Sequence, residues 1–302
     1  MILSEDNLWL YVVLIVVLAL VAVILSTKYR SNQRLAAFIR GRGFRLATDF
    51  AKKKNYIGLK WRRHEHYISG KMTADIEATR KGLSVYSSTK PEPENSGLFS
   101  FNHIGLNLKP VKNRTGIAVD VDVNSIGVRA CPDNSEPNLA RFVTGAVFFS
   151  NGPKRENDNW YNAIFVATGI GMMVGEDKPF EGLGAFAVIL HCKDTCLVLE
   201  EFSPHGKEAA EVILLRSFGP VEVGDTSTIG IEFIEEERKV IFYRDNDVYE
   251  HNFDMDMQIT DFNPFLKFDV ANFAAPCDSE DALAEISATV KKVYIKSQGR
   301  VT

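Results

Sequence analysis

The feature that most constrains this chain is an apolar run near its N-terminus. Residues 8–25 read LWLYVVLIVVLALVAVIL and contain no charge, amide or proline. As a helix this run covers about 27 Å, close to the hydrocarbon thickness of a bilayer, and a helix satisfies its own backbone hydrogen bonds where water is absent. Trp9, Tyr11 and Tyr29 lie near its ends, where aromatic side chains favour the membrane interface. The run therefore predicts one transmembrane helix over residues 8–27.

Two other interpretations of the run are a cleaved signal peptide and a buried core helix. A signal peptide begins with basic residues, has a shorter apolar region and ends in a small-x-small cleavage site. Here Glu5 and Asp6 precede the run, and Ser26-Thr27-Lys28-Tyr29 follows it. These flanks favour a membrane anchor that follows a short N-terminal tail at residues 1–7.

Basic residues are concentrated directly after the run. Residues 28–63 contain twelve Lys and Arg and one Asp, whereas residues 64–302 contain 23 basic and 36 acidic residues, within a net charge of −4. Basic residues close to a span favour the cytoplasmic side. The charge pattern therefore predicts the N-terminus outside and the following domain in the cytoplasm.

The segment 28–55 is expected to be a basic juxtamembrane region. Each Lys or Arg near an anionic membrane surface contributes about 1 kcal/mol of attraction. Apolar residues among residues 31–54 suit an interfacial helix broken near Gly41 and Gly43, while a lead-in helix packed on the domain and a plain stop-transfer signal remain open. The bilayer and its anionic headgroups are the expected partners of Lys28, Arg30, Arg34, Arg40, Arg42 and Arg45.

From about Tyr56 onward the sequence changes to short segments with a period of two. Residues 117–123 place four branched side chains on one face of a strand and Ala, Asp and Asp on the other. Residues 229–233, 239–243 and 248–253, with polar turns between them, predict two consecutive hairpins. Further strands are predicted at 71–78, 83–87, 104–108, 143–149, 162–168, 185–191, 196–202, 211–216, 265–271 and 287–295. So many short strands predict a mainly β fold, an antiparallel two-sheet sandwich over residues 56–297 followed by a tail at 298–302.

Several segments of the C-terminal third resemble the concanavalin A-like lectin/glucanase superfamily, the jelly-roll group that includes laminin-G-like modules. Residues 223–233 lead into a strand, and residues 240–247 form its partner and end in a turn similar to the family's Tyr-x-Asp-Gly, with Asp247 in place of the usual Gly. Residues 268–272 and 288–295 resemble the closing part, whose final strand returns beside the first.

The resemblance implies a jelly-roll sandwich with one concave face, which binds glycans and in some branches hydrolyses them. Such sandwiches more often work outside the cytoplasm, so an extracytoplasmic domain is the alternative to the placement that the charges predict. Fold alone does not determine function, and the residues must be considered separately.

Catalytic chemistry has little support in the sequence. Retaining glucanases need two carboxylates about 5 Å apart, which the family supplies as Glu-x-Asp-x-x-Glu. That motif is absent, and the nearest approximations are pairs at alternate positions, namely Asp75 with Glu77, Asp120 with Asp122, and Asp254 with Asp256. Phosphate-loop, dinucleotide and nucleophile-elbow motifs are also absent. We predict no catalytic residue and no nucleic-acid partner.

Four groups of residues are candidates for ligand or metal binding. The first group combines aromatic faces with amides, as sugar and peptide sites do, and consists of Asn157, Asp158, Asn159, Trp160 and Tyr161. Aromatic residues are also common in the core of a sandwich. Asp120, Asp122 and Asn124 on a strand, or Asp245, Asn246 and Asp247 at a turn, offer oxygen ligands for Ca²⁺, although turns and exposed strand faces contain the same residue types and neither group supplies six ligands by itself. His64 and His66 would share one side of a strand as half of a metal site. No other cofactor is expected.

The four cysteines, Cys131, Cys192, Cys196 and Cys277, do not have zinc-site spacing and are expected to be free thiols in a reducing compartment. Together these observations predict a single-pass, membrane-anchored, non-catalytic binding protein that presents a β-sandwich to a protein or glycan ligand. The alternatives are an anchored glycan-active hydrolase and a structural subunit of a membrane complex.

Overall fold

The computed structural model divides into two compact units, Met1–Gly43 and Phe44–Thr302, which are considered separately below. The residues that the structure describes are 13, 16–21, 37–52, 60–67, 69–96, 99–109, 113–132, 138–149, 155–156, 159–160, 163–174, 182–192, 210–253, 261–279 and 281–297.

Within the first unit, residue 13 and residues 16–21 are helical, and a second helical segment covers residues 37–41. A turn at residues 42–43 follows this segment, and the φ of Gly43, 85°, is a left-handed conformation that glycine adopts without a Cβ clash. The Arg42 guanidinium lies 5.1 Å from the centre of the Phe38 ring. No helix among the described residues is both long and apolar enough to cross a bilayer. The transmembrane helix at residues 8–27 stays a prediction.

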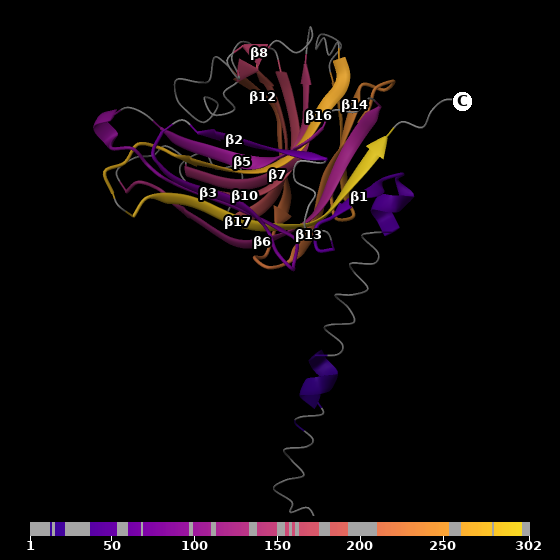
Figure 1. The fold of residues 1–302 in the computed structure, drawn as a ribbon, viewed down its shortest axis with the longest axis horizontal. Coiled ribbons are helices and arrows are strands. Elements are labelled where there is room, and N and C mark those ends of the chain that lie inside the picture. Colours follow the sequence, from indigo (N-terminus) through magenta and orange to yellow (C-terminus); the bar gives the residue numbers. More distant parts are fainter. Residues whose placement is uncertain are drawn as a thin grey trace, which may run out of the picture. The chain divides into compact units, whose positions relative to one another are not determined.

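The second unit consists of two antiparallel sheets, one over the other (Figure 1). One has eight strands, in the order β15-β14-β13-β6-β17-β4-β3, with β1 also paired to β17. Its strands are β1 (Arg45–Asp49), β3 (Lys71–Ala78), β4 (Leu83–Lys90), β6 (Arg114–Arg129), β13 (Thr226–Ile234), β14 (Lys239–Arg244), β15 (Asp247–Asn252) and β17 (Leu283–Ser297).

The other sheet has seven strands in the order β12-β11-β10-β7-β16-β5-β2. Its strands are β2 (Trp61–Tyr67), β5 (Ser100–Leu108), β7 (Asn138–Phe149), β10 (Ala163–Val174), β11 (Leu183–Cys192), β12 (Ala210–Pro220) and β16 (Asp261–Ala274). A short pair, β8 (Arg155–Glu156) and β9 (Asn159–Trp160), and one 3-10 turn, η1 (Glu94–Ser96), complete the described elements. The predicted mainly β, two-sheet sandwich is confirmed.

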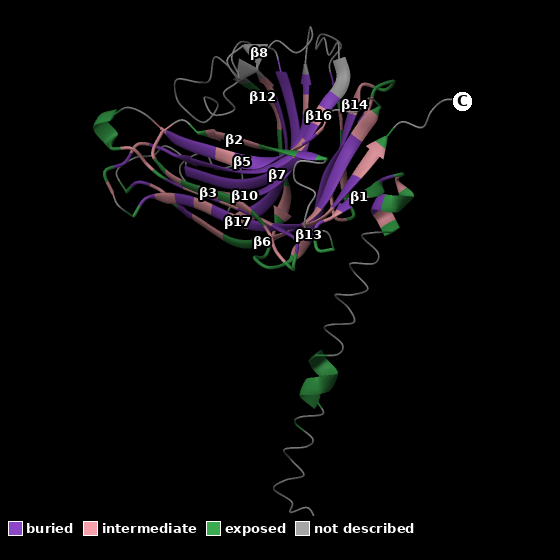
Figure 2. Ribbon diagram, viewed as in Figure 1, coloured by how far each residue is buried: buried purple, intermediate pink, exposed green. Residues whose placement is uncertain are grey.

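The core lies between the two sheets, and the central strands of both sheets contribute buried residues to it (Figure 2). On β6 the branched residues of the 117–123 segment face this core, as their period of two predicts. Trp61, Phe142, Phe148 and Phe268 are its largest contributions from the seven-stranded sheet, and the Trp61 and Phe268 rings are 5.2 Å apart. Burial of each such side chain stabilises the fold by about 1.5–3 kcal/mol.

Three buried polar side chains connect the two sheets inside this core. Ser87 of β4 donates a hydrogen bond to Asn102 of β5, and Asn272 of β16 donates to the Ser87 hydroxyl at 2.9 Å. Asn102 in turn donates to the Ser88 carbonyl at 2.8 Å. Because an unmade hydrogen bond is costly at such depth, this contact fixes how β4 lies against the opposite sheet.

The strand β1 lies inside the segment 28–55 that the sequence analysis expected to be a juxtamembrane region. It pairs with β17, so the final strand does return beside the first, as the family resemblance implies. Thr48 is 1% exposed and accepts a hydrogen bond from the Trp61 indole at 3.1 Å, and Phe50 is part of the core. The pairing with β17 and the burial of Thr48 and Phe50 therefore outweigh the basic composition, and the sandwich begins near Phe44.

The two predicted hairpins are confirmed, with β14 paired to both β13 and β15. Their turns contain Arg238 and Asp245, which have φ values of 47° and 53°. The strand predicted at residues 196–202 lies outside the described residues.

Candidate functional site

The outer face of the seven-stranded sheet, which points away from the core, has a group of polar side chains at its β2–β5–β16 side. Trp61, Leu108 and Phe268 face inward, so the residues that alternate with them face outward. We call five of these outward residues the outer-face cluster, and they are His64, His66, His103, Lys267 and Asp269.

His64 and Asp269 meet across a glycine. His64 of β2 and Asp269 of β16 are both in register with Gly105 of the intervening strand β5. A Cβ on Gly105 would lie 2.2 Å from the Phe268 carbonyl oxygen and 2.5 Å from the Asp269 Cβ, so no larger residue fits without a shift. Because the position is bare, His64 Nε2 comes within 3.6 Å of Asp269 Oδ2, although their strands are not neighbours.

Lys267 holds Asp269 in its ionised form. The Lys267 ammonium is 2.8 Å from Asp269 Oδ2, and their side chains are 13% and 3% exposed. Burial alone would raise the pKa of Asp269, but the charge of Lys267 and the adjacent His64 outweigh it and place that pKa well below its usual range. The ammonium also lies 4.7 Å from the centre of the Phe165 ring, a cation–π contact.

His103 lies between the other two imidazoles. Its ring centre is 5.1 Å from that of His64 and 5.8 Å from that of His66. Burial lowers the pKa of His103 well below its ordinary value, and the charge of Lys267 lowers it further, while Asp269 opposes both. His103 is therefore neutral at pH 7, and one of its ring nitrogens accepts a hydrogen bond while the other donates.

Apolar side chains flank the cluster on the same outer face. Phe101, Leu139, Met173, Ala271 and Phe273 form one group beyond the histidines. A second group follows across the sheet from Lys267 and consists of Val143, Phe165, Ala167, Phe186, Val188 and Leu190. The polar cluster therefore lies between two buried apolar groups.

Several polar atoms of this face are buried without a hydrogen bond within the described part of the chain. They include both ring nitrogens of His64 and Oδ1 of Asn107, which neighbours Lys267 across β5 and β16. Unsatisfied buried groups cost about 1–3 kcal/mol each, so these atoms retain hydrogen-bonding capacity that no described residue uses. The cluster can therefore both donate and accept hydrogen bonds to a ligand.

The structure places Asp120, Asp122 and Asn124 on one face of β6, as the sequence predicts, but gives each different partners. Asp120 accepts hydrogen bonds from Thr228 at 2.8 Å and Tyr294 at 2.9 Å. Burial raises the pKa of Asp120, which both hydrogen bonds oppose.

Asp122 pairs with Lys291 at 2.7 Å, and Asn124 donates to Thr289 at 2.9 Å. Within the described ranges, no group of three or more His, Cys, Asp or Glu side chains could hold a metal ion. The Ca²⁺ site at Asp120, Asp122 and Asn124 stays a prediction.

The other predicted site residues are described only in part. Asn157, Asp158 and Tyr161 lie outside the described residues, while Asn159 and Trp160 form β9 and pair with β8. Lys28, Arg30 and Arg34 also lie outside them. Arg40 and Arg42 belong to the first unit, and Arg45 begins β1.

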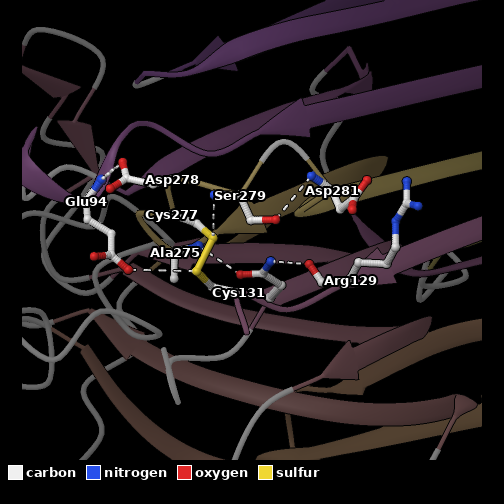
Figure 3. The surroundings of a disulfide bond; sticks show 9 residues. Glu94, Arg129, Cys131, Ala275, Cys277, Asp278, Ser279 and Asp281 are labelled. Atoms are coloured by element: carbon white, nitrogen blue, oxygen red, sulfur yellow. Dashed lines mark hydrogen bonds between the residues drawn. A yellow bond between two sulfur atoms is a disulfide. The ribbon is translucent and has the colours of Figure 1, made fainter. Parts of the chain in front are cut away.

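Cys131 and Cys277 form a disulfide, so the expectation of free thiols is wrong for these two residues (Figure 3). Cys131 follows β6 and Cys277 follows β16, so the bond joins the two sheets at one end of the sandwich. Their Cα atoms are 5.6 Å apart despite 146 residues of separation, because the fold brings these strand ends together.

Hydrogen bonds fix the same strand ends around the disulfide. Asn138, at the start of β7, donates to the Arg129 carbonyl at 2.7 Å and accepts from the Ala275 amide at 2.9 Å. The Cys277 amide donates to the Glu92 carbonyl at 2.8 Å. The disulfide is therefore built into an ordered, buried strand junction.

The sequence signal for this site was only partial. His64 and His66 were noted because they are two residues apart in an extended segment. His103 and Lys267 gave no signal, because their proximity depends on the strand order β2-β5-β16, which no local pattern specifies. Asp269 lies within residues 268–272, whose family resemblance predicts no role for this carboxylate.

No protein-family model matches the chain, and no curated protein matches it. Among solved structures, a legume lectin-like domain from Entamoeba histolytica is 12% identical and matches over 80% of this chain and 91% of its own, with a TM-score of 0.34. A glycoside hydrolase family 16 endo-glucanase from Bacteroides ovatus is 12% identical, over 82% and 98%, with a TM-score of 0.42. The VIP36 exoplasmic/lumenal domain is 9% identical, over 82% and 88%, with a TM-score of 0.36.

These solved structures belong to the concanavalin A-like jelly-roll group. The resemblance to that group is confirmed at the level of the two-sheet sandwich, which the strand pairing itself establishes. With TM-scores below 0.5, the likenesses bear on neither the ligand nor the activity of this chain.

Proposed function

We propose that this chain is a single-pass, membrane-anchored, non-catalytic binding protein that presents its sandwich outside the cytoplasm and binds a glycan on the outer face of the seven-stranded sheet. The outer-face cluster, with its donors, acceptors and apolar borders, is the observation that carries the proposal. Hydroxyl groups of a sugar both donate and accept hydrogen bonds, which suits the buried ring nitrogens of His64 and Oδ1 of Asn107.

The ion pair of Asp269 supports binding over hydrolysis. A glycosidase acid must be protonated near neutral pH, and its partner carboxylate must lie within about 5–10 Å. Lys267 holds Asp269 ionised at a distance of 2.8 Å. Among the described side chains on the outward-facing sides of β2, β5, β7 and β16, Asp269 is the only carboxylate. An ionised carboxylate of this kind accepts hydrogen bonds from ligand hydroxyls.

The Cys131–Cys277 disulfide supports placing the domain outside the cytoplasm. Structural disulfides persist in oxidising compartments and are rare in the cytosol. The basic residues after the apolar run favour the opposite orientation, but long domains translocate largely regardless of charge. We therefore adopt the extracytoplasmic alternative, with the helix at residues 8–27 as the anchor and the basic side chains from Lys28 to Arg45 near the lipid headgroups.

The test combines binding with turnover. Full-length protein in detergent micelles is applied to an immobilised oligosaccharide array and is incubated with β-glucan polysaccharides to detect released reducing ends. We expect binding without release. Lys267→Met is expected to lower binding at least tenfold, while Lys71→Met, on the exposed edge strand β3 of the other sheet, leaves it unchanged. Release of reducing ends that disappears in Asp269→Asn would instead establish a hydrolase.

A further inference from the structure

The chain contains one Asn-x-Ser/Thr triplet in which the middle residue is not proline, and it is Asn113-Arg114-Thr115. We propose that Asn113 is an N-glycosylation site. The inference rests on the proposed placement of the domain outside the cytoplasm, because this modification occurs only on that side of the membrane. It goes beyond that proposal, since an extracytoplasmic domain need not be glycosylated.

The local structure presents Asn113 to solvent. Asn113 is exposed and occupies the turn directly before β6. Its φ of 66° is left-handed, a conformation that asparagine tolerates better than most residues and that keeps the side chain out of the strand pairing. Because the Asn113 side chain is exposed, its amide nitrogen is accessible for modification.

Hydrogen bonds hold described residues on both sides of the turn in place. Arg114 donates a hydrogen bond to the Lys109 carbonyl at 2.7 Å, and the Lys109 amide donates to the Lys60 carbonyl at 3.0 Å. Thr115 is half-buried at the start of β6 and is in the third position that the modification requires. A bulky glycan on Asn113 is therefore compatible with the folded sandwich.

The turn and the disulfide lie at opposite ends of β6. Arg114 begins this strand of 16 residues, and Cys131 follows its last residue, Arg129. At about 3.3 Å per residue the two points are separated by about 50 Å along the strand. Modification of Asn113 and oxidation of Cys131 thus report on the same compartment through independent chemistry.

The transfer needs a lipid-linked oligosaccharide diphosphate as the co-reactant. The Asn113 Nδ2 forms a bond to the anomeric carbon of the first sugar, and the bond between that carbon and the diphosphate oxygen breaks. The lipid diphosphate leaves with the electron pair, and the amide nitrogen loses one proton. No oxidation or reduction takes place, so the step is independent of the disulfide.

The experiment is synthesis of the full-length chain in the presence of sealed microsomes from endoplasmic reticulum. We expect one step of reduced gel mobility that an N-glycosidase reverses. Asn113→Gln and Thr115→Ala are expected to abolish the step, and Thr115→Ser to retain it. Thr115→Ser is the matched control, because it conserves the hydroxyl that the triplet requires.

Peptide mapping of the same samples separates the two proposals. An unmodified chain in which the Cys131 and Cys277 peptides are linked would overturn the glycosylation site and leave the extracytoplasmic placement standing. An unmodified chain without that linkage would overturn both. A mobility step that persists in Asn113→Gln would also overturn the site, because the modified residue would then be a different one.

Discussion

Asp269 and His103 depend on each other for their protonation states. Lys267 and the imidazoles keep Asp269 ionised, while burial keeps His103 neutral. Two neighbouring histidines in the sequence, His64 and His66, hinted at this chemistry as half of a metal site. The third imidazole and the carboxylate come from strands about 40 and about 200 residues further along the chain, respectively. Sequence patterns of period two show which way a side chain points, but not which strand lies beside it.

His103 makes stability depend on pH in the mildly acidic range. Its pKa is lowered in the folded state, so below about pH 6.5 the unfolded chain binds a proton that the folded chain does not. The contribution of His103 to the free energy of unfolding is therefore fully present above pH 6.5, and it is lost as the pH falls towards the lowered pKa. Between pH 7.5 and 5.5 we expect a loss of about 1 kcal/mol that is absent in His103→Asn.

Denaturant unfolding of the full-length protein at pH 7.5, 6.5 and 5.5 measures this difference. For each protein, the free energy of unfolding at the lower pH values is compared with its own value at pH 7.5. Any packing lost in His103→Asn is present at every pH and therefore does not affect this comparison. Parallel pH profiles for the wild type and His103→Asn would contradict the lowered pKa.

At the scale of elements, local periodicity predicts where strands occur more accurately than it predicts the residues at which they begin and end. Residues 71–78 were predicted as a strand and form β3 with the same bounds, because both faces alternate to the last residue. Residues 117–123 were predicted as one strand, but β6 continues to Arg129 because β17 pairs with its whole length. The strand β1 was missed, since its basic neighbours favoured an interfacial helix. Pairing over long distances decided both differences.

Gly105 is the element-scale position on which the candidate site depends. Gly105→Ala is expected to destabilise the sandwich by about 1–3 kcal/mol, because the new methyl group would overlap the Phe268 carbonyl oxygen. Gly127→Ala on β6 is the matched control, because its nearest neighbour is the end of the flexible Glu285 side chain, at 3.0 Å. Thermal unfolding compares the two variants, and equal losses of stability would contradict the close approach of β5 and β16.

At the scale of the whole molecule, the disulfide is a covalent bond between two sheets that pack together largely through their side chains. Neither cysteine lies in a recognisable motif, and their pairing follows from the sandwich, which places the ends of β6 and β16 together. The sequence could therefore predict the fold class but not this bond. The charge pattern alone predicts a cytoplasmic domain, whereas the disulfide favours the proposed placement outside the cytoplasm.

Loss of the disulfide is expected to weaken the sandwich. Removing a native disulfide that closes a long loop costs about 2–5 kcal/mol, chiefly because the unfolded chain gains freedom. The double variant Cys131→Ser/Cys277→Ser should unfold at lower denaturant concentration than the wild type, and reduction of the wild type should reproduce that shift. A wild type that unfolds at the same concentration with and without reductant would contradict a structural role for the bond.

The orientation of the anchored domain is tested most directly by protease protection in sealed microsomes, with carbonate extraction of the same membranes. If the account is correct, protease added outside the vesicles leaves a fragment containing residues 44–302 intact until detergent is added, and alkaline carbonate leaves the full-length chain in the membrane. Digestion of that fragment in intact vesicles, or release of the chain by carbonate, would contradict an anchored sandwich outside the cytoplasm.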